Sequence, residues 1–133
     1  MSIFGRRVSG RSVAALAVVL FIGGLLPVLS KAPSREITLV TRGMAFYVDG
    51  DFDTPNPTIH VPAGETIRIV LRNADPGIAH DFAVPALDEA LDPIGTSETG
   101  SLTFDLPNTP GTYQYVCRPH MLMMKGTIVV DAK

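Results

Sequence analysis

The chain of 133 residues has room for one compact domain and a short terminal segment. With 46% hydrophobic and 18% charged residues, its composition is that of a folded globular protein and excludes an intrinsically disordered chain. The formal net charge is −2, and a chain without an excess of basic residues lacks the basic footprint that nucleic acid requires, which argues against a nucleic-acid partner.

The N-terminal segment, residues 1–31, differs from the rest of the chain. Arg6, Arg7 and Arg11 precede an uncharged apolar run, residues 13–29. A basic stretch followed by an apolar one is typical of an export signal. As a helix the run would extend about 25 Å, less than the ~30 Å of a bilayer's hydrocarbon core. The segment predicts a cleaved signal peptide, with an N-terminal membrane anchor as the alternative, and places the domain in the periplasm or another extracytoplasmic space.

The remainder of the chain is acidic. Four of the eleven basic residues lie within residues 1–31, whereas all thirteen acidic residues lie beyond them. Seven basic against thirteen acidic residues leave a net charge of −6 on the exported part. This charge favours docking to a basic partner.

From Arg35 onward, short apolar segments alternate with turn residues, which predicts strands. Residues 49–57 are expected to form an acidic loop, and residues 85–100 a long polar connection with a short helix near 86–91. The pattern predicts an all-β fold, a Greek-key antiparallel β-sandwich over residues 35–133. The seven or eight expected strands lie around 37–39 and 44–48 and at 58–61, 65–73, 78–84, 101–106, 112–117 and 126–130.

The single cysteine is the residue that most needs an explanation. Cys117 cannot form an internal disulfide, and a lone thiol in an exported protein indicates intermolecular pairing or a specialised use. His120 follows it in the same expected loop, and His80 lies at the end of another expected strand, just after a Pro–Gly turn. The loop also holds three methionines, Met121, Met123 and Met124. One thiolate, two imidazoles and a thioether are the ligand set of a blue-copper site.

These ligand types suit a metal that changes oxidation state. Thiolate and thioether sulfur favour Cu(I), whereas imidazole also suits Cu(II), so a mixed set holds both ions. Loops tied to strands on both sides would keep the ligands in place as the electron arrives. The pattern predicts transfer of single electrons.

The sequence GTYQYVCRPHMLMMKGTIVV, residues 111–130, resembles the Gly-Thr-Tyr-x-Tyr-x-Cys-x-x-His…Met-x-Gly-x-Ile-x-Val ending of the cupredoxin family. These are small blue-copper proteins such as plastocyanin, pseudoazurin and amicyanin. VPAGETIRIVLRN followed by AHDF is similar to that family's strand and first-ligand region, and the resemblance covers about residues 35–131. It implies that His80, Cys117 and His120 are the strong equatorial ligands of one type 1 copper ion. It also implies an electron carrier and not an enzyme.

Two ways of counting give different axial ligands. Counting back from the last strand, MKGTI matches the family's Met-x-Gly-x-Ile phrase and selects Met124. Counting forward from His120 selects Met123, with an amicyanin-like spacing. The backward count is preferred because Gly126 and the strand fix where the loop ends. Met124 is therefore predicted, with Met123 and then Met121 as alternatives.

Two departures from the family bear on function. Asp81 follows the first histidine ligand where the family usually has Asn, and an anion there would favour Cu(II) and lower the reduction potential. The clustered methionines leave room for a second function, an exported copper carrier or chaperone that uses the same cluster. Such a carrier would prefer Cu(I), exchange its metal readily and be weakly coloured.

The loop around His120 is also the expected working face. In the family, the edge of this ring usually reaches the surface, which would make it the electron exit. Pro119, Met121 and Leu122 would frame it with an apolar patch. We expect a monomeric domain whose patch docks briefly with a redox protein, either a cytochrome or a copper oxidoreductase.

Other residues are expected to be structural. His60 is read as a strand residue that binds no metal, Met44 as core, and Tyr113 and Tyr115 as sandwich packing. A structural zinc site is disfavoured because such sites usually combine several cysteines. A binuclear copper centre would need a second cysteine in the loop, and a nucleophilic Cys–His pair would leave the methionines unexplained.

Overall fold

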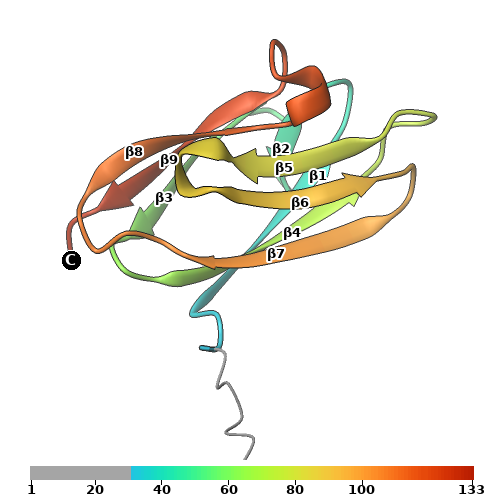
Figure 1. Ribbon diagram of the computed structural model, residues 1–133. Helices are drawn as coiled ribbons and strands as arrows, with labels where there is room; N and C mark the ends of the chain where they lie inside the picture. Colours follow the sequence, from blue (N-terminus) through green and yellow to red (C-terminus); the bar gives the residue numbers. More distant parts are fainter. Residues whose placement is uncertain (1–30) are drawn as a thin grey trace, which may run out of the picture.

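The computed structural model describes residues 31–133. Within these residues, nine strands form two sheets packed face to face, and two short 3₁₀ helices lie in connections between strands (Figure 1). The predicted signal or anchor segment lies, except for Lys31, outside the described residues. Within residues 31–133, no helix is long and apolar enough to span a membrane.

The first sheet has the strand order β2-β1-β4-β7. Strand β1 pairs antiparallel with β2 and parallel with β4, which pairs antiparallel with β7. The apolar residues that alternate along β4, namely Ile67, Ile69 and Leu71, are fully buried against the second sheet. The strands are β1 (Arg35–Thr41), β2 (Phe46–Val48), β4 (Thr66–Asn73) and β7 (Thr99–Asp105).

The second sheet has the order β3-β9-β8-β5-β6. Strand β3 pairs parallel with β9, and the remaining neighbours are antiparallel. Its strands are β3 (Thr58–Pro62), β5 (His80–Val84), β6 (Glu89–Ile94), β8 (Gly111–Val116) and β9 (Lys125–Asp131).

The predicted β-sandwich is confirmed, but the expectation of purely antiparallel pairing is wrong. Alternation of apolar and polar residues reports which face of a strand is buried and carries no information on the direction of its neighbour. Both parallel pairs, β1 with β4 and β3 with β9, join strands that are far apart along the chain. Such long connections are what parallel pairing requires.

The polar connection expected over residues 85–100 is also wrong, because β6 and the start of β7 lie in it. In place of the expected helix near 86–91 there is one 3₁₀ turn, η1 (Pro85–Leu87). Strand β6 is the edge of its sheet, is largely exposed and contains Pro93. Edge strands tolerate polar residues and proline, so this segment has the composition of a loop.

An aromatic cluster joins the two sheets. The Tyr115 ring of β8 stacks on Phe82 of β5 at 5.3 Å between centroids, and both rings meet Phe46 of β2 edge-on. The buried Tyr115 hydroxyl donates to the carbonyl of Pro57 at 2.6 Å. This contact fixes the loop before β3 against the end of the sandwich that carries the β8–β9 connection.

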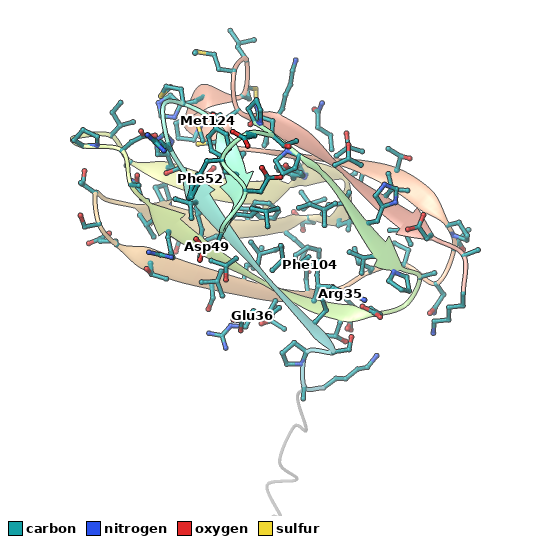
Figure 2. The ribbon with its side chains drawn as sticks, turned by 180° about the vertical axis from the view of Figure 1, so that it is seen from behind. Arg35, Glu36, Asp49, Phe52, Phe104 and Met124 are labelled. Atoms are coloured by element: carbon teal, nitrogen blue, oxygen red, sulfur yellow. The ribbon has the colours of Figure 1, made fainter. Side chains whose placement is uncertain are left out.

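The β8–β9 connection lies at one end of the sandwich, and the start of β1 at the other (Figure 1). The view from behind shows the same arrangement, with Met124 at one end of the sandwich and Arg35 at the other (Figure 2). The predicted ligands are therefore gathered at the end remote from the first described residues.

Candidate metal centre

His80 is the first residue of β5 and is completely buried, with 0% of its surface exposed. Its Nδ1 lies 3.7 Å from the Cys117 Sγ, and its Nε2 lies 2.9 Å from Oδ2 of Asp75. Burial lowers the pKa of His80, although the carboxylate of Asp75 acts in the opposite direction. Burial thus favours the neutral imidazole, which is the form that binds metals.

Cys117 follows the end of β8, and His120 closes the 3₁₀ turn η2 (Arg118–His120). The Nδ1 of His120 lies 3.5 Å from the Cys117 Sγ. One ligand atom from each of His80, Cys117 and His120 falls within 4.8 Å of the others. The structure therefore brings together the three residues predicted as equatorial ligands.

The Cys117 sulfur is buried and accepts a hydrogen bond from the Asp81 backbone N–H at 3.4 Å. Burial raises the pKa of the Cys117 thiol, and this hydrogen bond partly offsets the shift. A bound cation would shift the equilibrium toward the thiolate, which is the metal-binding form. The pocket is thus suited to a metal more than to a free nucleophile.

Backbone hydrogen bonds close the ligand loop tightly. The Cys117 N–H donates to the Met124 carbonyl at 3.0 Å, and the N–H groups of Met123 and Met124 both donate to the His120 carbonyl. The Asn56 side chain donates to the Met123 carbonyl at 3.0 Å. These bonds tie the start and end of the loop together and anchor it to the segment before β3.

The three loop methionines differ sharply in burial. Met124 is 0% exposed and belongs to the hydrophobic core, whereas Met121 is 50% and Met123 60% exposed. The backbone bonds of Met124 to Cys117 and His120 hold it against both ligands. Of the three loop methionines, Met124 is therefore the one that is buried in the core.

Asp81 is 1% exposed and forms an ion pair that the sequence did not reveal. Its Oδ1 accepts the Arg118 backbone N–H at 2.7 Å, and its Oδ2 accepts the Arg118 Nε–H at 2.6 Å. The carboxylate raises the pKa of the Arg118 guanidinium through this hydrogen bond and through its charge. The anion that departs from the family pattern thus has its own cation, and the only sequence signal was a basic residue directly after Cys117.

Two further polar residues behind His80 were missed. Asp75 and Asn73 are buried, and the Asn73 side chain donates to the carbonyls of Ile78 and Ile94 at 2.7 and 3.1 Å. These bonds hold the turn that leads into His80. Both residues lie near turn-forming residues in the sequence, where polar side chains are ordinary and carry no signal of a buried role.

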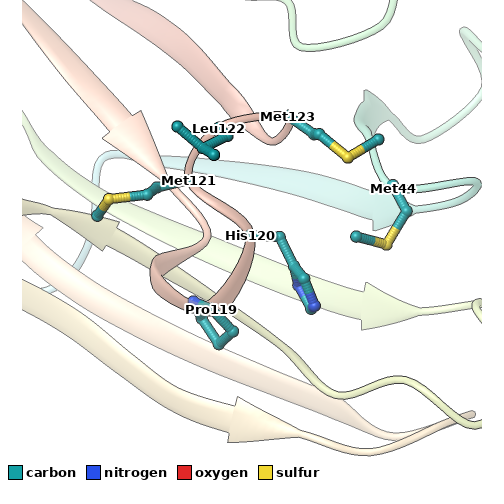
Figure 3. Close-up of a pocket in the computed structure, with 6 residues that line it drawn as sticks. All are labelled: Met44, Pro119, His120, Met121, Leu122 and Met123. Atoms are coloured by element: carbon teal, nitrogen blue, oxygen red, sulfur yellow. The ribbon is translucent and has the colours of Figure 1, made fainter.

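An apolar hollow of about 540 Å³ opens beside His120 (Figure 3). Met44, expected to be core, is only partly buried and lies on its rim with a left-handed backbone, φ 63°. Figure 3 shows Met44 and Met123 on the same side of His120 and Met121 on the other. The hollow is lined by Met44, Pro119, His120, Met121, Leu122 and Met123.

His60 takes no part in the cluster. It is an exposed strand residue of β3, as expected, and its Nδ1 lies 3.1 Å from Asp131 Oδ2. Tyr115 packs inside the sandwich as expected, while Tyr113 is only partly buried.

Comparison with known proteins shows which family the chain resembles. Residues 13–130 match the family model of the cupredoxin-like domain. The chain is 28% identical to amicyanin-alpha of Methylorubrum extorquens over 122 residues, covering 90% of this chain and 88% of that protein. It is 38% identical to amicyanin of Paracoccus denitrificans over 78 residues, covering 56% of each.

The fold is shared with solved structures as well. Auracyanin B superposes with a TM-score of 0.62 at 22% identity, covering 77% of this chain and 93% of that one. The two imidazoles and the thiolate of the described site fit one copper ion, the cofactor of this family. The resemblance predicted from the sequence is confirmed, and the chain belongs to the cupredoxin family.

Proposed function

We propose that this protein carries single electrons outside the cytoplasm through one type 1 copper ion held by His80, Cys117, His120 and Met124. The observation that carries the proposal is the convergence of the three ligand atoms within 4.8 Å. Sulfur and imidazole together accommodate Cu(I) and Cu(II). Strands on both sides of each ligand segment limit how far the ligands move, and cupredoxins of this kind are electron carriers and not enzymes.

Burial supports Met124 as the axial ligand. A weak axial thioether needs a fixed position next to the equatorial ligands, and Met124 is enclosed in the core and hydrogen-bonded through its backbone to Cys117 and His120. Met121 and Met123 expose half or more of their surface, which suits the rim better than the metal pocket.

The half-buried His120 is the proposed electron exit. Its ring borders the apolar hollow, and Leu122 beside it is 87% exposed. An apolar rim on an acidic domain suits brief docking with a redox protein that has a basic surface around an apolar centre. A cytochrome or a copper oxidoreductase fits this description, and the domain itself is proposed to be monomeric.

The export segment is proposed to deliver the domain to the periplasm, either as a cleaved signal or as an anchor formed by residues 13–29. Fractionating cells that make the full chain, followed by N-terminal sequencing, would separate the two. A shortened soluble form indicates cleavage, and a full-length form in the membrane fraction indicates the anchor. A full-length cytosolic product would contradict export.

The copper centre is tested by adding Cu(II) to the full chain and recording visible and EPR spectra. We expect an intense thiolate-to-copper band and reversible one-electron redox chemistry. Cys117→Ser is the matched control, since it replaces only the sulfur and should abolish the band. Absence of a strong thiolate band in the unaltered protein would contradict the proposed function.

Three methionines around the hollow favour a second candidate function, a copper carrier. Met44, Met121 and Met123 all border the hollow beside His120, where a Cu(I) ion could be handed over. A carrier would bind Cu(I) in preference, exchange it within the time of mixing with a chelator, and show weak colour. Slow exchange with strong colour would support the electron carrier instead.

A further inference from the structure

The carboxylate of Asp75 lies directly behind His80, on the side of the ring away from Cys117. The Nδ1 of His80 faces the Cys117 sulfur at 3.7 Å, while its Nε2 contacts Oδ2 of Asp75 at 2.9 Å. The two ring nitrogens therefore have separate partners. One is available to a metal in the pocket, and the other is committed to a carboxylate.

Asp75 is held in place from several segments. Its Oδ1 accepts the N–H of Gly43 at 2.6 Å, its own N–H donates to Asn73 Oδ1 at 2.9 Å, and its carbonyl accepts the Thr96 hydroxyl at 2.9 Å. The same Asn73 oxygen also accepts the hydroxyl of Thr41 at 3.0 Å. The carboxylate is thus fixed by the β1–β2 hairpin, the end of β4 and the turn before β7.

The direction of these hydrogen bonds determines the protonation of the ring. An ionised carboxylate only accepts, so the bond at Oδ2 requires His80 Nε2 to be the donor. In a neutral imidazole the remaining nitrogen, Nδ1, then carries a free lone pair. That lone pair points to the pocket shared with Cys117 and His120.

Asp75 and Asp81, the two buried acids of the site, differ in whether a cation compensates their charge. Asp81 is paired with the guanidinium of Arg118 at 2.6 Å, so its charge is compensated. Within residues 31–133, the only basic side chain recorded at ion-pair distance from Asp75 is His80 itself. A negative charge with no separate cation therefore lies one imidazole ring away from the metal pocket.

We propose that Asp75 is a positioning residue that holds His80 in the Nε2–H tautomer and, through its charge, makes the copper site favour Cu(II) over Cu(I). A carboxylate bonded to a ligating histidine orients the ring and makes it a stronger donor. The more highly charged ion gains more from a nearby anion. This inference rests on the proposed function, and it gives to Asp75 the influence on the potential that the sequence suggested for Asp81.

The first test is the reduction potential of Asp75→Asn in the full chain. Asparagine keeps the size and one acceptor oxygen but removes the charge. We expect the preference for Cu(II) over Cu(I) to fall at least tenfold, which raises the potential by about 59 mV or more for one electron. Asp53→Asn is the matched control, because it removes the same charge from an exposed loop residue, and its preference should change less than twofold. Equal potentials in the two variants would overturn the proposal.

A second test needs no variant and no copper. In metal-free protein with ¹⁵N-labelled histidine, His80 should carry its proton on Nε2, and that proton should exchange slowly with water. The exposed His60 and the half-buried His120 serve as internal references for fast exchange. A His80 proton on Nδ1, or rapid exchange at Nε2, would overturn the proposal. Because this measurement omits copper, its failure is distinct from the loss of the thiolate band that would overturn the proposed function.

Discussion

The two histidines of the site face the same sulfur from regions of opposite character. Their Nδ1 atoms lie 3.7 and 3.5 Å from Cys117 Sγ, so as candidate ligands His80 and His120 are nearly equivalent. His80, however, begins a core strand and is locked to Asp75, whereas His120 sits in a 3₁₀ turn at the edge of an open hollow. In the proposed copper site, the first region would hold the metal in place, and the second would give it contact with the surroundings.

The largest expected effect comes from exchanging each histidine for glycine. His80→Gly should weaken copper binding more than 100-fold, beyond the 10–100-fold typical of losing an outer partner, because a ligand is lost. It should also destabilise the metal-free protein by about 1–3 kcal/mol, since the buried Asp75 loses its partner. Copper titration and chemical unfolding measure the two effects.

His120→Gly is the matched variant in the exposed region, and added imidazole separates the two sites. The open hollow should admit imidazole to the gap left by His120, so the thiolate band should return at millimolar imidazole. The buried gap left by His80 should not be refilled. Recovery of both variants, or of neither, would remove the contrast between a closed and an open half of the site.

The next largest effect is expected from replacing the loop methionines. They show the same contrast between a buried and an exposed side chain within four residues. Met124→Leu keeps the volume and should cost less than about 1.5 kcal/mol of stability. It should nonetheless raise the reduction potential and alter the EPR spectrum, because Cu(II) loses a donor and gains an apolar neighbour. Cyclic voltammetry and EPR are the measurements.

Met123→Leu is the control for this prediction, with the same substitution at the adjacent, 60% exposed position. Its potential and EPR spectrum should match those of the unaltered protein. The reverse result would make Met123 the axial ligand and support the forward count from His120.

The candidate ligand loop was predictable because its signals are local. Cys117 and His120 share one loop, and the motif ending in Gly126 marks where that loop must stop. The structure supplies the reason for the glycine: a side chain there would collide with the ring of Tyr115. Close packing of β9 against Tyr115 requires a glycine at position 126, so the sequence shows where β9 begins. The backward count to Met124 relied on that glycine.

The surroundings of His80 were not predictable for the opposite reason. Asp75 acquires its role through Gly43, 32 residues away, and both residues lie in stretches that read as ordinary turns. The Arg118 side chain reaches Asp81 across 37 residues. Contacts between distant turns depend on how the sheets bring them together, and neither periodicity nor motif spacing reports on that.

A smaller effect should follow from Arg118→Gln, which leaves Asp81 with the backbone N–H but without the guanidinium. The uncompensated anion should strengthen the preference for Cu(II) several-fold and lower the potential, opposite in sign to Asp75→Asn. Arg68→Gln is the control, because Arg68 is an exposed arginine paired with Glu36 near the remote end of the sandwich (Figure 2). A raised potential in Arg118→Gln would contradict the compensation of the Asp81 charge by Arg118.

The smallest effect on the copper itself is expected from Met121→Lys, at the rim of the exposed half. The visible spectrum and the potential should stay unchanged, because Met121 points away from the hollow's Met44 side and is half exposed (Figure 3). Reduction by a docking redox partner should slow by about one order of magnitude, since a charge must be desolvated in an apolar contact and repels a basic surface. Stopped-flow mixing measures the rate, and Thr103→Lys on β7 adds the same charge to an exposed position outside the rim. Equal slowing in both variants would assign the effect to net charge, whereas a lost spectrum in Met121→Lys would make Met121 a ligand and leave the exposed half without a separate docking role.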